Sequence, residues 1–95
     1  MQHPHPKLFN LSDKKSKDLP VYMLRDGHLY RTAFHPRGWS EHPQYCLERD
    51  GKFYRTQFHE KGFSSEPAYR FGKDQMIYRV APGNQTDRPI YQLKD

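Results

Sequence analysis

Hydrophobic and polar residues alternate along most of the chain, in short runs that are separated by turn residues. Four of these runs share the pattern Pro-x-Tyr-x-Leu/Phe and begin at Pro20, Pro43, Pro67 and Pro89. Each of the first three is followed by a turn, a second tyrosine that precedes an arginine, and a glycine-bearing loop. Alternation with a period of two is typical of β-strands, and these repeats show no helical period. The pattern predicts an array of one repeated β unit.

The turns within the repeats indicate that each unit is a β-hairpin. Asp26-Gly27 and Asp50-Gly51 are strong hairpin signals, because glycine adopts the positive φ of such turns without a steric cost. We therefore predict hairpins over residues 20–33, 43–57 and 67–80.

The register of the first two hairpins follows from the length assigned to each loop. A three-residue loop would place Tyr22 opposite Tyr30, and a four-residue loop would place Tyr45 opposite Tyr54. We expect these registers because both put the two tyrosines of a hairpin on one face of the sheet, where they would fill the core.

The last repeat, from Pro89, contains a first strand but no return strand. We expect residues 8–11, within an N-terminal tail of residues 1–19, to supply the missing strand and to pair with residues 90–93. The repeat domain would then span residues 20–95. The predicted fold is all-β, with three full hairpin units and a half unit closed into a pseudo-four-fold barrel or flower-like ring. The alternative is an open sheet whose unpaired edges close by homo-oligomerisation.

The composition indicates what class of protein this is and what kind of partner it would bind. The chain has 95 residues, a formal net charge of +5 and a mean hydropathy of -1.16, which suit a single domain with an anionic partner. Cys46 is the only cysteine, so neither an intramolecular disulfide nor a cysteine metal cage can form. The N-terminus has no apolar run, and we expect a cytoplasmic protein without a membrane span.

Three arginines occupy one position of the repeat. Arg31, Arg55 and Arg79 each follow the second tyrosine, so they lie on the other face of the strand. A closed ring would gather their guanidinium groups into a concave positive band that suits phosphate or carboxylate. Alternatively, each arginine is a solvated residue of the outer surface.

The loops of the first two units share histidines and aromatic residues that the third unit lacks. His35 and His59 match each other, as do Trp39 and Phe63. The spacing has no zinc signature, and loop hydrogen bonds are the simplest role for the histidines. The aromatic residues are candidates for partner contact or for plugs at the mouth of the barrel.

These features favour a non-enzymatic binding module that needs no cofactor or metal. The expected ligand-binding residues are Arg31, Arg55, Arg79, Trp39, Phe63, His35 and His59. Nucleic acid is the first expected partner, because basic and aromatic residues together suit phosphates and bases, and a charged glycan or an acidic protein comes next. The alternative is a small enzyme with one asymmetric site that uses His35 or His59 with tyrosine and arginine.

Overall fold

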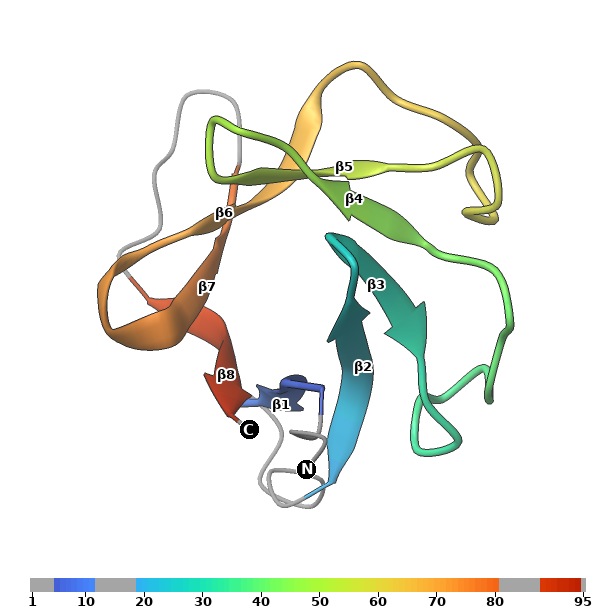
Figure 1. Ribbon diagram of the computed structural model, residues 1–95, viewed down its shortest axis with the longest axis horizontal. Coiled ribbons are helices and arrows are strands. Elements are labelled where there is room, and N and C mark those ends of the chain that lie inside the picture. The colour runs from blue at the N-terminus through green and yellow to red at the C-terminus, as the bar shows by residue number, and fades with distance from the viewer. Residues whose placement is uncertain (1–4, 12–18, 81–87, 95) are drawn as a thin grey trace.

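Eight antiparallel strands, each hydrogen-bonded to the next along the chain, close into a barrel (Figure 1). The computed structural model describes residues 5–11, 19–80 and 88–94. The strands are β1 (Lys7–Asn10), β2 (Pro20–Arg25), β3 (His28–Arg31), β4 (Tyr45–Leu47), β5 (Lys52–Arg55), β6 (Pro67–Phe71), β7 (Met76–Arg79) and β8 (Pro89–Lys94), with a 3₁₀ turn η1 at Lys73–Gln75. The described residues include no α-helix, and none of their helical turns could span a membrane. The predicted all-β fold is confirmed.

The barrel is closed by the two ends of the chain. Strand β1 pairs with β8 in the register Leu8 opposite Leu93 (Figure 1), and the Leu11 amide donates to the Ile90 carbonyl at 2.9 Å. This pairing confirms the predicted ring closure and places it within one chain. The barrel therefore has no unpaired edge that a second chain must cover.

The first hairpin turns on two residues rather than three. Arg25 pairs with His28, so Asp26 and Gly27 alone form the loop, with φ values of 52° and 77°. Two positive φ angles are typical of the type I′ turn, whose twist matches that of the flanking strands.

The second hairpin also has a loop one residue shorter than expected. The Glu48 amide donates to the Lys52 carbonyl at 3.0 Å, which leaves three residues in the loop, with Gly51 at a φ of 79°. A three-residue loop with a left-handed last residue is the common alternative to the two-residue turn.

The predicted register is therefore wrong by one residue in both hairpins, and the pairs Tyr22–Tyr30 and Tyr45–Tyr54 do not form. The first tyrosine of each full unit lies opposite its arginine instead: Tyr22 opposite Arg31, Tyr45 opposite Arg55 and Tyr69 opposite Arg79. Because paired residues share a face of the sheet, the arginines lie on the inner face and the second tyrosines on the outer one.

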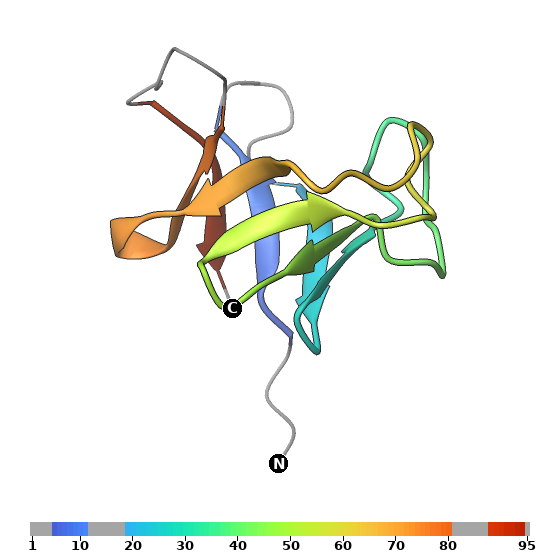
Figure 2. The ribbon, with the colours of Figure 1, turned by 90° about the horizontal axis from the view of Figure 1, so that it is seen from above.

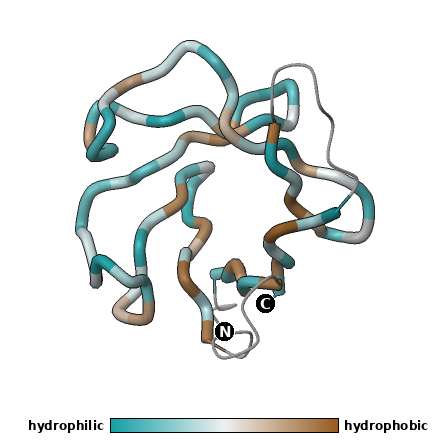
Figure 3. The backbone as a smooth tube through the Cα atoms, turned by 180° about the vertical axis from the view of Figure 1, so that it is seen from behind, coloured by the Kyte–Doolittle hydropathy of each residue, from teal (hydrophilic) through white to brown (hydrophobic). Residues whose placement is uncertain are grey.

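The interior is built from three layers, to which each unit contributes one residue. The layers are Tyr22, Tyr45, Tyr69 and Tyr91; then Leu8, Leu29, Phe53 and Ile77; then Leu24, Leu47, Phe71 and Leu93. In the middle layer no side chain is more than 1% exposed. Figure 3 shows the corresponding alternation of hydrophobic and hydrophilic positions along the strands. Burial of these side chains is the main source of stability of the barrel.

The tyrosine layer is a closed ring of edge-to-face contacts. Successive ring centroids are 5.8 Å (Tyr22–Tyr45), 5.2 Å (Tyr45–Tyr69), 5.7 Å (Tyr69–Tyr91) and 5.8 Å (Tyr91–Tyr22) apart. Edge-to-face pairs of this kind are favourable beyond the area that they bury. The ring lies at the end of the barrel from which the β3–β4 and β5–β6 loops project, and Figure 2 shows these two loops on the same side of the molecule.

Candidate functional site

The β3–β4 and β5–β6 loops begin with the same hydrogen-bonded turn. Thr32 Oγ1 donates to the Pro20 carbonyl and accepts from the Phe34 amide, and Thr56 makes the matching bonds with Pro43 and Phe58. The hydroxyl group thereby ties the start of each loop to the first strand of its own unit. The repeated sequence thus produces two loops of the same shape, side by side.

Each loop then places a histidine over one tyrosine of the ring. The Arg37 amide donates to His35 Nδ1 at 3.0 Å, so this nitrogen is the acceptor and the ring proton is on Nε2. His35 Nε2 lies 3.2 Å from the hydroxyl oxygen of Tyr22 and donates to it. The imidazole therefore uses both of its nitrogens within the protein.

The second loop repeats this arrangement. The Lys61 amide donates to His59 Nδ1 at 3.0 Å, and His59 Nε2 donates to the Tyr45 hydroxyl at 3.1 Å. Burial, followed by the nearby charge of Arg31, lowers the pKa of His35, and burial followed by the charge of Arg55 lowers the pKa of His59. Both imidazoles are therefore neutral near pH 7.

The hydroxyl groups of Tyr22 and Tyr45 remain protonated. Burial, followed by the neighbouring Tyr69, raises the pKa of Tyr22 and of Tyr45 well above the ordinary value. Since each of these hydroxyl oxygens accepts from a histidine, its own proton is available to a neighbouring tyrosine or to a group above the ring.

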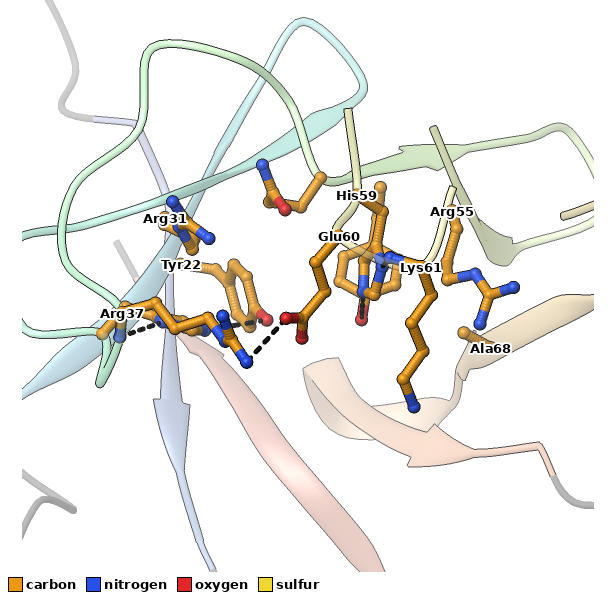
Figure 4. Close-up of a pocket in the computed structure, with 11 residues that line it drawn as sticks. Tyr22, Arg31, Arg37, Arg55, His59, Glu60, Lys61 and Ala68 are labelled. Atoms are coloured by element: carbon orange, nitrogen blue, oxygen red, sulfur yellow. Dashed lines mark hydrogen bonds and ion pairs between the residues drawn. The ribbon is translucent and has the colours of Figure 1, made fainter. Parts of the chain in front are cut away.

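A pocket of about 250 Å³ lies between the two loops, above Tyr22 and Tyr45 (Figure 4). Its lining consists of Tyr22, Arg31, His35, Arg37, Gln44, Tyr45, Arg55, His59, Glu60, Lys61 and Ala68. Four of these side chains are cationic and one is a carboxylate. Positive charge held above a packed, apolar barrel core is little screened and attracts anions.

The two inward-facing arginines of the pocket differ in the hydrogen bonding of their Nε atoms. Arg55 Nε donates to the Gly62 carbonyl at 3.1 Å. Arg31 Nε is buried and, within the described part of the chain, has no hydrogen-bond partner. A buried donor is seldom left without an acceptor, so an acceptor entering the pocket would satisfy it.

An ion pair joins the two loops across the pocket. Arg37 Nη2 lies 2.6 Å from Glu60 Oε2, and the two side chains are 60% and 42% exposed. Figure 4 shows Glu60 between Tyr22 and His59. Exposed pairs of this kind contribute little to stability, so the pair can open at small cost.

The structure brings together Arg31, Arg55, His35 and His59 in this pocket. Arg79 is exposed on β7 and is not part of the described lining.

Trp39 and Phe63, which we expected to lie near the arginines, line other grooves. Trp39 lies with Met23 and Tyr30, and Phe63 lies with Tyr54. In an adjoining groove Phe63 also lies with Arg55, as expected for that one pair. The second tyrosines mark the outer wall of the barrel, so the loop aromatics lie against that wall. At 67% and 70% exposure, Trp39 and Phe63 do not act as plugs of the barrel mouth.

Sequence reasoning missed three charged lining residues, Arg37, Glu60 and Lys61. Arg37 and Lys61 occupy the same position of the two loops, whereas Glu60 stands where the first loop has Pro36. Opposite charges on otherwise matching loops were the available signal for a contact between them.

Comparison with protein-family models, curated proteins and solved structures found no significant match. The chemistry of the pocket therefore carries the functional inference. Guanidinium, ammonium and phenol groups are donors, and Glu60 supplies the one carboxylate of the described lining. Within the described residues, no three histidine, cysteine or acidic side chains are grouped to hold a metal ion. This set of donors is complementary to an oxyanion.

Proposed function

We propose that the protein is a non-enzymatic binding module that holds nucleic acid by phosphate at the pocket between its two loops. The observation that carries this proposal is the convergence of Arg31, Arg37, Arg55 and Lys61 on one pocket. Arginine and lysine together supply both directed and point-charge contacts to a phosphate group.

A binding role is favoured over an enzyme that uses the histidines. A general base needs a nitrogen within reach of the proton that it removes. In His35 and in His59, Nδ1 accepts from a backbone amide and Nε2 donates to a tyrosine. These bonds suit an imidazole that shapes the floor of the pocket.

Nucleic acid is favoured over other polyanions because the two loops that form the pocket also carry exposed aromatic residues. The loops carry Phe34, Trp39, Phe58 and Phe63, which are 45–70% exposed. Bases stack on such side chains without regard to sequence, typically with about 1–3 kcal/mol for each base. A strand whose phosphate entered the pocket would have these platforms on both loops beside it.

The salt dependence of binding to a single-stranded oligonucleotide tests the proposal. We expect the double variant Arg37→Gln, Lys61→Gln to bind more weakly and to reduce the slope of log K against log salt by about 1.4, because two phosphate contacts are lost. The matched control is Arg49→Gln, Lys73→Gln, which removes the same charge outside the pocket and should retain most of the slope.

If the two double variants lose the same amount of affinity and of salt slope, binding follows net charge rather than the pocket. That result would refute the proposed site. If the wild-type protein binds no oligonucleotide at moderate salt, nucleic acid is the wrong partner. A charged glycan or an acidic protein is then the better candidate.

A further inference from the structure

The pocket is closed at its base. Its floor is formed by Tyr22 and Tyr45, which belong to the closed tyrosine ring. Below the ring lies the middle layer of the core, in which no side chain is more than 1% exposed. A group that enters between the loops must leave by the same opening, so a polymer cannot thread through the barrel.

The size of the pocket limits what can enter it. Sites that enclose a small molecule have volumes of about 300–1,000 Å³, and this pocket has about 250 Å³. It therefore lies at the small end of the range and has room for a phosphate group. An internal phosphodiester carries chain on both sides and can only pass across the opening, whereas a terminal phosphate has one ester link and can point inward.

Hydrogen-bond donors for such a group lie in the inner part of the pocket. Arg31 Nε is buried and lacks a partner within the described residues, and Arg55 and Lys61 also line the pocket. The Tyr22 and Tyr45 hydroxyls, in contrast, are each already hydrogen-bonded to a histidine and to a neighbouring tyrosine. A phosphate monoester presents three terminal oxygens, one more than a diester, and can reach more of the cationic donors.

The carboxylate of Glu60 makes binding in the pocket depend on the charge of the group that enters. This carboxylate, with one negative charge, already holds Arg37 at 2.6 Å inside the pocket. A phosphodiester also has one charge and gains no electrostatic advantage in displacing it. A phosphate monoester has a charge of about −1.5 to −2 at pH 7 and does gain one.

We propose that the pocket selects the terminal phosphate monoester of a nucleic-acid strand over internal phosphodiesters, and that Glu60 sets this preference. The inference rests on the proposed function and adds the part of the nucleic acid that is recognised. The end of the strand is held in the pocket, and the following bases lie along the loop aromatics.

The first test compares two single-stranded ten-nucleotide DNAs of one sequence, with a 5′-phosphate or a 5′-hydroxyl end. We expect the wild-type protein to bind the phosphorylated strand about tenfold more tightly at pH 7.5, because the additional charge meets several cations at short range. Two unphosphorylated strands, with one and two more nucleotides, bracket the total charge of the phosphorylated strand. Both should bind like the shorter 5′-hydroxyl strand.

The second test uses the variant Glu60→Gln. Without the competing carboxylate, the 5′-hydroxyl strand should bind about tenfold more tightly than it does to wild type, and the preference for the 5′-phosphate should fall to about twofold. Glu66→Gln is the matched control, since Glu66 is exposed and does not belong to the pocket lining. It should keep the wild-type preference.

The outcomes separate this inference from the proposed function. Equal binding of both strands by wild type would overturn end recognition and leave nucleic-acid binding in place, whereas no binding of either strand would overturn both. If Glu60→Gln and Glu66→Gln have equal effects, Glu60 is not the selecting residue. Tighter binding of a phosphoserine peptide than of the phosphorylated strand would assign the pocket to phosphoproteins.

Discussion

At the scale of single residues, hydrogen bonds from the main chain decide the chemistry of the pocket floor. The amides of Arg37 and Lys61 fix the tautomers of His35 and His59, and the histidines in turn fix the tyrosine hydroxyls. A backbone donor cannot change its protonation state, so it holds this arrangement for as long as the imidazoles are neutral. The sequence indicated the repeated histidines, but not the tyrosines that they reach.

The bond between Tyr45 and His59 should contribute measurably to stability. In the variant Tyr45→Phe, His59 Nε2 loses its acceptor while the aromatic ring stays in place. We expect the free energy of unfolding to fall by about 1 kcal/mol, as measured by urea denaturation. The control Tyr30→Phe alters an outer-face tyrosine that packs under Arg25 and should change stability by less than about 0.5 kcal/mol. Equal effects of the two variants would contradict the role given to the bond.

The lowered pKa values of His35 and His59 predict a pH dependence of stability. In the unfolded chain both titrate near the ordinary pKa of 6.5, whereas folding lowers that pKa. The unfolded state therefore binds more protons as the pH falls below 6.5, and stability falls between 6.5 and the folded-state pKa. The charged groups that act on the two rings are Arg31, Arg37, Arg55, Lys61 and Glu60.

Thermal unfolding of the wild type at pH 7.5 and 5.5 would measure this effect. We expect a lower Tm at pH 5.5, and a smaller decrease in the double variant His35→Gln, His59→Gln. An equal decrease in both proteins would assign the pH dependence to other groups.

At the scale of the elements, loop length determines what the barrel presents inside and outside. The recurrence of proline and tyrosine was sufficient to predict the hairpins and the closing strand. The register depended on one residue in each turn, and a shift of one residue exchanges the two faces of a strand. The arginines consequently lie on the inner face of the sheet, opposite the first tyrosine of each unit. Trp39 and Phe63 could not be placed from the sequence, because their position depends on the path of an irregular loop.

Strand β1 should be indispensable for the barrel. Leu8 is fully buried between Tyr22 on β2 and Leu93 on β8, and we expect Leu8→Ala to lower the free energy of unfolding by about 2–5 kcal/mol. The control Leu11→Ala changes a leucine that is 40% exposed and should have a much smaller effect. Removal of residues 1–12 eliminates β1, exposes the edges of β2 and β8, and should cause unfolding or aggregation. Unchanged thermal stability in that truncation would contradict the closing role.

At the scale of the whole molecule, the barrel has nearly four-fold symmetry, but the pocket that it carries does not. Asn10 occupies in β1 the position that Arg31, Arg55 and Arg79 occupy in the full units, and the matching pair of histidine loops belongs to the first two units alone. Repetition therefore supplies the tyrosine ring and the inner arginines. Repetition also places a cation, Arg37 or Lys61, after the histidine of each loop, whereas divergence supplies Glu60 in place of Pro36 and with it one asymmetric pocket.

The pairing of β1 with β8 also constrains how the protein is made. The ribosome delivers residues 7–10 long before residues 89–94, yet these two strands must meet to complete the ring. During translation one edge of β1 stays open, and the two layers of the core that take Tyr91 and Leu93 from β8 remain incomplete. Contacts between such distant parts of a chain form slowly, and open strand edges recruit other chains. Until residues 89–94 are available, the nascent chain therefore exposes an open strand edge and an unfinished core.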